Sequence, residues 1–326
     1  MQHTLFALCT LLSFLAFGQR KNATPVQAPV AIQNQSPIEA KVAGMKKYPG
    51  YVEFYYDEKQ DKVFLLIDKF DTEFLYIESL TAGIGSNDIG LDRNQLGSER
   101  VVKFERRGPK VLLTQLNYSY RAISSNEAER KAVQEAFAQS VLAGFTVSAE
   151  EAGKVLVEAT DFLLQDAHDV AGRLRSTQQG NYTLDKTRCA FYLPRTKNFP
   201  QNSEFEVTLT FSGQPTGAYI RSVTPTPSVV TVREHHSFVQ LPDADYKPRK
   251  FDPRAGYFST SYYDYATPIS EPIEKRWITR HRLQKKDPNA PVSEPVKPIV
   301  YLYGCRCTGA YPLSIDGWRA LVEPGI

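Results

Sequence analysis

Apolar and polar side chains alternate along most of this chain, and that alternation predicts β-strands. The run Glu204–Phe211 alternates strictly, so one face of the strand is expected to be buried and the other to meet water. Tyr51–Tyr56 and Lys62–Asp68 flank a short polar turn. Arg100–Arg106 and Lys110–Leu116 flank a second turn at a Gly-Pro pair. Each pair predicts a β-hairpin. Further strands are expected at Phe74–Ile77, Val155–Ala159, Arg188–Leu193, Tyr219–Val223, Val229–Leu241 and Arg276–Leu283.

Two segments carry helical signals instead. Ser124 and Glu127 have the spacing of a capping box, and Gly144 is the expected end of that helix. Apolar residues follow the box at intervals of four, at Val133, Phe137 and Val141. A second helix is expected near Phe162–Leu174. Strands clustered around about two helices indicate an α+β fold that is mainly antiparallel β-sheet, built from hairpins or as a partial sandwich.

The first residues have the pattern of a secretory signal peptide. Leu5–Phe17 is apolar, and Ala16 and Gly18 place small side chains before an expected cleavage site ahead of Gln19. Residues 1–18 are therefore assigned to a signal peptide, and the protein is expected to be secreted, periplasmic or at the cell surface. A buried strand or a short anchor helix is the alternative. No other segment is apolar and long enough to predict a transmembrane span.

Composition divides the remainder of the chain. In order, the expected parts are a flexible lead rich in Gln, Asn, Pro and Ala (19–45), a β-rich domain (46–286), a Pro-rich linker (287–297), and an edge strand with an irregular tail (298–326). The β-rich domain leaves open a division into two lobes, 46–120 and 121–286.

Charge and cysteine content narrow the class of protein. A net charge of +3 is too small to indicate nucleic acid or an anionic membrane as the partner. Of the four cysteines, Cys189 is the one outside the expected signal peptide and the irregular tail. We therefore expect no intramolecular disulfide framework in the exported protein, and a fold held together by its apolar core.

Glu234, His235 and His236 are the nearest approach to a metal-binding set. Zinc peptidases place two histidines one helical turn apart in His-Glu-x-x-His, and no pair among the five histidines has that spacing. Adjacent residues of a strand point to opposite faces, so we expect one of these histidines to be packed and the other exposed. The trio stays a candidate metal-ligand set, and no catalytic residue is assigned.

Two other groups have candidate chemistry. Asp166, His168 and Asp169 suggest a carboxylate–histidine pair, but on a helix His168 points away from the face shared by the two aspartates, which favours a plain helix surface. The aromatic-rich stretch Tyr257–Tyr265 suggests a platform for saccharide or peptide, with packing on a sheet face as the alternative.

Three segments carry a resemblance to a known family, namely Arg233–Pro242, Phe251–Phe258 and Arg276–Pro288. Together they resemble the region that precedes the catalytic domain in large secreted bacterial zinc-dependent metalloproteases of the metzincin-like type. In that family the segment equivalent to Lys297–Leu302 is a strand that leads into a helix of the catalytic domain. Here the strand is followed by Tyr303–Ile326, which has neither helical nor strand period.

The codons of this tail allow a second sequence when they are shifted forward by one nucleotide. With free choice of third bases they encode MDAGAPEPIRSPLMDGARWWNQAF, which agrees with the helix of the family at nearly every position. Each shifted codon admits only a few amino acids, so agreement along the whole stretch is difficult to attribute to chance. We interpret the chain as out of frame after residue 302.

The resemblance implies that this chain is the non-catalytic N-terminal portion of an exported zinc-dependent metalloprotease, without its His-Glu-x-x-His domain. It implies that this chain binds no cofactor and is inactive on its own, because the zinc belongs to the missing catalytic domain. The expected partners are that domain and the peptide or protein substrate of the intact enzyme. The alternative is a self-sufficient β-rich extracytoplasmic binding module for glycan or protein.

Overall fold

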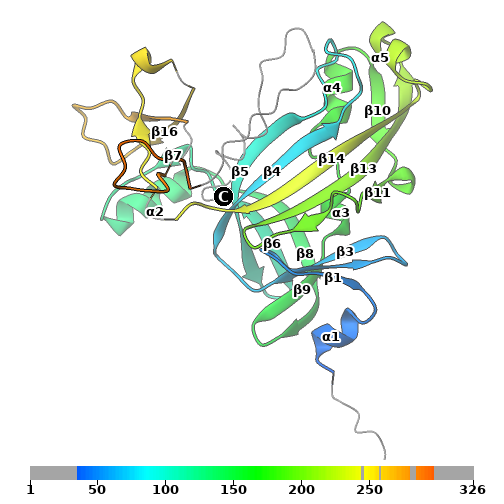
Figure 1. Cartoon of the computed structure of the whole chain (residues 1–326), viewed down its shortest axis with the longest axis horizontal. Coiled ribbons are helices and arrows are strands. Elements are labelled where there is room, and N and C mark those ends of the chain that lie inside the picture. Colours follow the sequence, from blue (N-terminus) through cyan, green and yellow to red (C-terminus); the bar gives the residue numbers. More distant parts are fainter. Residues whose placement is uncertain (1–34, 244–245, 257, 280–283, 297–326) are drawn as a thin grey trace, which may run out of the picture. The chain divides into compact units, whose positions relative to one another are not determined.

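The structure is a computed structural model that describes residues 35–243, 246–256, 258–279 and 284–296 (Figure 1). The chain divides into two compact units, Met1–Gln35 and Ser36–Ile326, and all elements named below belong to the second. The expected signal peptide (1–18) and the expected edge strand and tail (298–326) lie outside the described residues.

Antiparallel strands dominate the described residues, which confirms the α+β, mainly β, expectation. The larger sheet contains β1 (Lys46–Tyr48), β2 (Phe54–Asp57), β3 (Lys62–Ile67), β4 (Glu73–Ala82), β5 (Gln95–Arg107), β6 (Lys110–Gln115), β8 (Ser140–Glu151), β9 (Lys154–Glu158), β10 (Gly180–Leu184), β11 (Ala190–Phe191), β12 (Lys197–Asn198), β13 (Asn202–Pro215) and β14 (Val229–Gln240). The smaller sheet contains β7 (Tyr120–Arg121), β15 (Arg249–Lys250), β16 (Ser259–Asp264) and β17 (Glu274–Ile278).

Helices are short, and the described residues contain five α-helices where the sequence predicts about two. They are α1 (Pro37–Lys41), α2 (Glu127–Ala136), α3 (Thr160–Leu163), α4 (Val170–Ser176) and α5 (Ala218–Val223). Two 3-10 turns, η1 (Lys186–Arg188) and η2 (Pro253–Ala255), complete the set.

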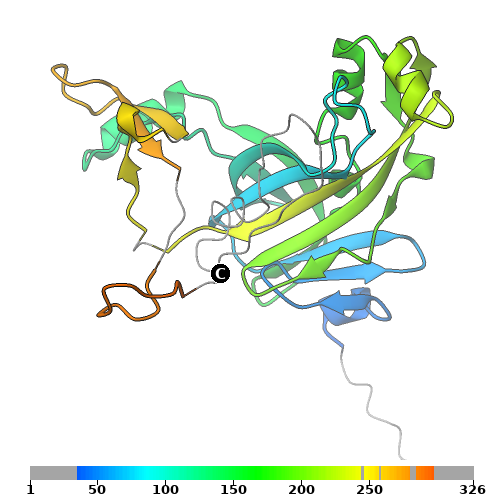
Figure 2. The same cartoon turned by 45° about the horizontal axis from the view of Figure 1, so that its top comes forward.

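The larger sheet is continuous and curves around its own interior (Figures 1 and 2). Its strand order is β1-β2-β3-β9-β8-β6-β5-β4-β14-β13-β10, with β11 and β12 also paired to β13. The predicted hairpins are present as β2–β3 and β5–β6. The central strand β14 lies between β13 and β4, with both pairings antiparallel. The segment Arg233–Gln240 is therefore held on both sides by backbone hydrogen bonds.

Side-chain hydrogen bonds nearly close this sheet by joining its first strands to the β12–β13 region. The amide Nδ2 of Asn198 donates to the carbonyl oxygens of Tyr48 and Val52 at 2.8 and 2.9 Å. The backbone N–H of Val52 donates to Ser203 Oγ at 2.9 Å. A Cβ at Gly50 would lie 2.2 Å from Asn198 Oδ1, so this close approach requires glycine.

The core is formed by alternate residues of each strand together with α3 and α4. On β13 the inward residues are apolar, as the strict alternation predicts, and they are fully buried: Phe205, Val207, Leu209 and Phe211. Phe205 packs with its ring centroid 4.6 Å from that of Phe54 and 5.6 Å from that of Phe238. Helices α3 and α4 add Phe162, Leu163, Val170 and Leu174 to the same cluster.

The helix predicted from Ser124 to Gly144 is wrong in its second half. Helix α2 ends at Ala136 and is capped by Asn126, whose side chain accepts from the N–H of Ala128. Residues from Ser140 onward form β8, which pairs with β6 and buries Phe145 in the core. Sheet pairing therefore outweighs a local helical spacing, as tertiary contacts commonly do.

Three other predicted elements also differ. The helix expected at Phe162–Leu174 is split into α3 and α4 by the loop 164–169. The strand expected at Tyr219–Val223 is helix α5, because the N–H of Ile220 donates to Gln179 Oε1 at 3.0 Å while its side chain is fully buried. The end of the expected flexible lead forms α1, which has a Ser36–Glu39 capping box and a buried Ile38.

The smaller sheet has the order β15-β17-β16-β7, and its β16–β7 pair is parallel. Its inner contacts centre on Arg121, whose guanidinium lies 4.5 Å from the ring centroid of Tyr118 and 4.4 Å from that of Tyr262. Asp264 Oδ1 accepts the N–H groups of Ile123 and Ala266 at 2.9 and 3.1 Å, which fixes the start of the β16–β17 loop. Among the described residues, no helix is long and apolar enough to cross a membrane.

Candidate functional site

Strand β14 carries candidate chemistry on both of its faces. Glu234 and His236 point into the core and are fully buried. His235 and Ser237 lie on the opposite face, where they approach Glu204 and Glu206 of β13. The predicted separation of the two histidines is confirmed, but the expectation that one of them is exposed is wrong, because the His235 side chain is only 17% exposed.

His236 is a neutral imidazole with a defined tautomer. Its Nε2 lies 2.9 Å from the carbonyl oxygen of Leu163, which can only accept, so Nε2 carries the proton. Its Nδ1 lies 3.0 Å from the hydroxyl of Tyr76, which therefore donates to it. Burial lowers the pKa of His236 to about 3. Both ring nitrogens are used, so this histidine has no free lone pair for a metal.

Glu234 is a buried acid. Neither of its carboxyl oxygens has a hydrogen-bond partner among the described residues. Burial, followed by the nearby charge of Asp166, raises the pKa of Glu234 well above its ordinary range. The nearby backbone N–H groups of Ala167 and His168 partly lower the pKa of Glu234 again, but they are not placed to form hydrogen bonds with its carboxyl oxygens. Burial therefore favours the uncharged carboxylic acid form of Glu234.

A buried ion pair lies on the strands beside this acid. Glu78 of β4 is 2% exposed and pairs with the guanidinium of Arg100 on β5. Its Oε1 also accepts the N–H of Ser98 at 2.9 Å. A Cβ at Gly97 would lie 2.2 Å from Glu78 Oε1, so glycine makes room for the carboxylate. The pair is compensated charge that anchors β4 to β5 inside the sheet.

On the outer face, His235 bridges two carboxylates. Its Nε2 lies 2.7 Å from Glu204 Oε2 and its Nδ1 lies 3.2 Å from Glu206 Oε2. Burial lowers the pKa of His235, but hydrogen bonds and charge from the two glutamates raise it by more, to about 9. The imidazolium is therefore the main cation that neutralises Glu204 and the fully buried Glu206. A second cation, the guanidinium of Arg195, lies 3.8 Å from Glu206 Oε2.

The expected trio of Glu234, His235 and His236 does not form a metal site. The first and last share the interior, whereas His235 is on the other face with both nitrogens bonded to carboxylates. Across the described ranges, no group of three or more His, Cys, Asp or Glu side chains is arranged to hold a metal ion. The residues described here do not fit a zinc centre.

Asp166, His168 and Asp169 do not lie together on a helix. They belong to the loop between α3 and α4, where both oxygens of Asp166 accept N–H groups at the start of α4, from Val170 at 2.7 Å and Ala171 at 2.9 Å. Burial lowers the pKa of His168, whose Nε2 lies 3.4 Å from Gln95 Oε1. Asp169 is exposed and has a left-handed φ of 56°. Asp166 is therefore a helix cap.

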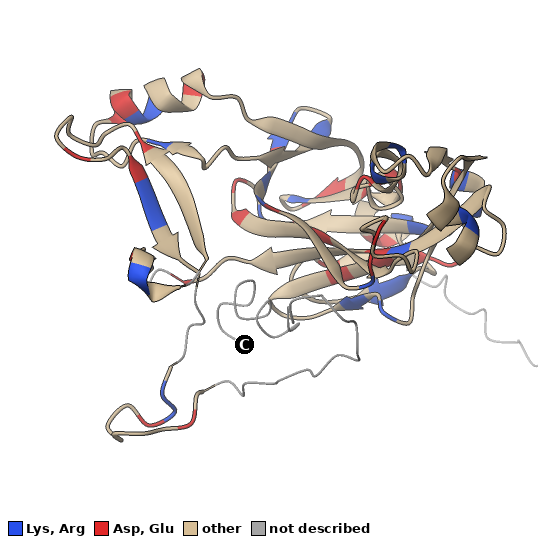
Figure 3. Ribbon diagram, turned by 90° about the horizontal axis from the view of Figure 1, so that it is seen from above, with Lys and Arg blue, Asp and Glu red and all other residues tan. Residues whose placement is uncertain are grey.

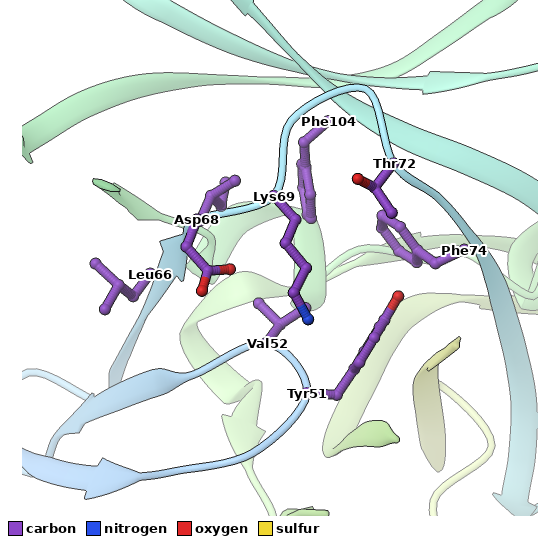
Figure 4. Close-up of a pocket in the computed structure, with 9 residues that line it drawn as sticks. Tyr51, Val52, Leu66, Asp68, Lys69, Thr72, Phe74 and Phe104 are labelled. Carbon is purple, nitrogen blue, oxygen red and sulfur yellow. The ribbon is translucent and has the colours of Figure 1, made fainter. Parts of the chain in front are cut away.

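A small pocket opens between β3 and β4 (Figure 4). Phe74 and Phe104 are among its apolar walls, and the Lys69 ammonium lies 5.1 Å from the ring centroid of Tyr51 at its mouth. Its volume of about 20 Å³ accommodates about one water molecule. That is too small for a peptide side chain or a sugar ring.

The aromatic stretch of the smaller sheet is partly a packed face and partly surface. Tyr262 is 6% exposed, while Tyr263 and Tyr265 are 41% and 50% exposed. Tyr263 stacks on Tyr120, and Tyr265 lies 5.3 Å from the ring of Phe137 between centroids. Tyr257 lies outside the described residues. Among the described residues of this stretch, the exposed rings are those of Phe258, Tyr263 and Tyr265.

Charged residues are interspersed over the strands and helices rather than gathered by sign (Figure 3). Among the described residues, this distribution agrees with the small net charge.

No curated protein and no solved structure matches the chain. Residues 94–286 match a family described as a domain of unknown function (DUF5117). The matched range runs from the residue before β5 to a point beyond the end of β17 and covers more than half of the 326 residues. The chain therefore belongs to the DUF5117 family.

Proposed function

We propose that this chain is the non-catalytic N-terminal portion of an exported zinc-dependent metalloprotease whose catalytic domain is encoded one nucleotide out of frame. The observation that carries the proposal is the tail Tyr303–Ile326. Its shifted codons allow a helix that the resembling proteases have directly after their upstream region, and the tail begins where that helix is expected.

The geometry supports a structural role for the segments that carry the resemblance. Arg233–Val239 is the part of β14 that pairs with β4 and β13 at once. Its two histidines are occupied by partners within the fold, His236 with Tyr76 and His235 with Glu204. Arg276 of β17 packs its guanidinium 3.9 Å from the ring centroid of Phe251. These contacts stabilise a scaffold, and the proposal assigns the chemistry to the domain that follows.

The test begins with the gene. If the nucleotide sequence beyond codon 302, shifted forward by one base, encodes no His-Glu-x-x-His within a few hundred bases, the proposal is wrong. If the motif is there, a frame-restored protein is compared with the chain as given. We expect only the restored protein to bind about one zinc ion and to cleave an unfolded protein in a chelator-sensitive way. Its control replaces the motif glutamate with glutamine, which should keep the zinc and lose the cleavage.

The partly exposed Tyr263 and Tyr265 favour a second candidate, a β-rich extracytoplasmic module that binds glycan or protein. Tyr263 stacks on Tyr120, and Tyr265 packs against Phe137 with its ring tilted, which limits the entropy lost on binding. Binding on a glycan array that is lost in Tyr265→Ala and kept in Tyr219→Ala, an exposed aromatic residue on α5, would support it. Equal binding by both variants would exclude this surface.

A further inference from the structure

Glu234 is a fully buried acid, and neither of its carboxyl oxygens has a hydrogen-bond partner among the described residues. The Nε2 of His236 lies 3.8 Å from Glu234 Oε1, but it donates its proton to the carbonyl oxygen of Leu163. A buried polar group without a partner costs the folded protein free energy, and native structures rarely keep one that has no role. Any rearrangement that admits water to this carboxyl group recovers that free energy.

Titratable groups from four described segments surround this acid. They are Asp166 and His168 of the loop between α3 and α4, Tyr76 and Glu78 of β4, Arg100 of β5 and His236 of β14 itself. On the sheet side, Glu78 is paired with Arg100, and the hydroxyl of Tyr76 donates to His236. On the loop side, the Nδ1 of His168 is a second buried atom without a partner within the described ranges. A charge on Glu234 would be repelled by the charges of Asp166 and Glu78.

The loop is the side of this cluster that can move. Glu234 pairs with both β13 and β4, so its own backbone is held from two sides. Loop residues 164–168 are half-buried and Asp169 is exposed, whereas the residues on either side of the loop, Leu163 and Val170, are fully buried. A segment with little buried apolar surface between two fixed ends is of the kind that opens locally while the rest of the fold stays intact.

Few contacts hold the loop closed. Both oxygens of Asp166 accept N–H groups of α4, from Val170 at 2.7 Å and Ala171 at 2.9 Å. The last loop residue, Asp169, has a left-handed φ of 56°, which costs free energy for a residue with a side chain. Beneath the loop, the register of β14 against β4 shifts at Glu234, and such bulges re-aim side chains beside functional sites. Opening therefore breaks the two Asp166 hydrogen bonds, relaxes this backbone strain and hydrates Glu234.

We propose that the loop 164–169 is a pH-sensitive gate over Glu234, closed while this acid is protonated and open once it is ionised. The closed form holds its proton above the ordinary pKa range of glutamic acid, so it loses stability relative to the open form as pH rises through that range and up to the raised pKa. His168 acts in the opposite direction below pH 6.5, because burial lowers its pKa. The effect of Glu234 is therefore isolated above pH 6.5. This gate does not depend on the proposed function.

Hydrogen exchange of the chain as given between pH 7 and pH 8 tests the gate. Amide exchange is catalysed by hydroxide, so an amide whose opening is independent of pH exchanges about tenfold faster per pH unit. Opening that is linked to ionisation of one acid adds a further factor of about ten. We therefore expect the amides of Val170 and Ala171, which Asp166 holds in the closed form, to exchange about a hundredfold faster per pH unit.

Variants assign this excess to one acid. Glu234→Gln keeps the volume and cannot ionise, so the rise for both amides should return to about tenfold. The matched control is Asp161→Asn, which replaces an acid of α3 whose side chain is 90% exposed and should keep the larger rise. If Glu234→Gln does not fold, the carboxyl carbon resonance of Glu234 in the wild type replaces it. The excess must then end at the pH where that resonance titrates, and an excess that ends elsewhere refutes the gate.

Three results would overturn the proposal. A rise of only about tenfold in the wild type shows that opening is not linked to an acid. A larger rise that persists in Glu234→Gln assigns the linkage to another group, such as Asp166. Exchange of Val170 and Ala171 that is no faster than exchange of the β14 amides shows that water reaches Glu234 only by global unfolding, and not through a gate.

Discussion

Replacing His235 with glutamine should destabilise the protein in a way that depends on pH. The imidazolium of His235 neutralises two glutamates on the outer face of β13 and β14, and one of them, Glu206, is fully buried. Glutamine fills a similar space and keeps a donor, but it carries no charge. The variant therefore leaves two carboxylates side by side without their cation.

The magnitude follows from two independent arguments. Removing one partner of a buried charge pair typically costs about 3–5 kcal/mol. A rise of the His235 pKa from 6.5 to about 9 on folding corresponds to about 3 kcal/mol of stability from protonation alone. We therefore expect His235→Gln to lower the free energy of unfolding by about 3 kcal/mol at pH 6.

The pH dependence has a definite sign. The folded state binds its proton more tightly than the unfolded state, so the stabilisation is fully present below pH 6.5 and is lost as pH rises through about 9. Urea unfolding of both proteins at pH 6 and pH 10 measures this difference. The free energy of unfolding of the wild type should exceed that of the variant by about 3 kcal/mol at pH 6. By pH 10, the part of this difference that comes from the charge of His235 should be nearly gone.

A matched control is His168→Gln. Burial lowers the pKa of His168, so the wild-type protein loses stability relative to this variant as pH falls below 6.5. This pH dependence is opposite to that expected for His235→Gln. A second comparison, His235→Gln combined with Glu206→Gln, should recover part of the loss because one of the unpaired carboxylates is gone. A gap between wild type and His235→Gln that is equal at pH 6 and pH 10 would refute the charge bridge.

Three further outcomes are expected from urea unfolding or thermal denaturation. The free energy of unfolding of Glu234→Gln should be within about 1 kcal/mol of the wild-type value near pH 5. As pH rises, the variant should become the more stable protein, because the raised pKa of Glu234 makes ionisation of the folded wild type unfavourable. A difference between the two proteins that stays constant from pH 5 to pH 8 would contradict this. Gly97→Ala should cost about 2 kcal/mol or more, since its Cβ would overlap the Glu78 carboxylate. The control is Gly144→Ala, whose Cβ would meet only Leu112 Cδ2 at an ordinary contact distance of 3.5 Å. Asn198→Ala removes two of the three hydrogen bonds that nearly close the sheet and should cost about 2 kcal/mol. An unchanged free energy of unfolding would show that the closure does not depend on these two bonds.

The two faces of β14 could be predicted from alternation, but the partners of its polar residues could not. The sequence places His235 and His236 on opposite faces, and the structure agrees. That His235 meets Glu204 and Glu206 depends on the register of β13 against β14, which a single strand does not reveal. The buried pair of Glu78 and Arg100 was missed for a related reason. The strand was expected to end at Ile77, one residue before the inward position that Glu78 occupies.

The predicted helices failed where long-range contacts compete with local spacing. Val141 lies four residues after Phe137, which is a helical spacing, but in the structure it pairs with Thr114 between β6 and β8. In the loop before α4, the acidic residue that suggested catalysis serves the backbone instead. Asp166 is half-buried, and both of its oxygens accept N–H groups that a helix start would otherwise leave unpaired. Burial raises the pKa of Asp166 overall and these two donors reduce the rise, so the hydrogen-bond geometry, and not the pKa, identifies the cap. In a strand-rich chain, an acidic residue just before a helix is therefore more often the acceptor for unpaired N–H groups of the first helical turn than a catalytic group.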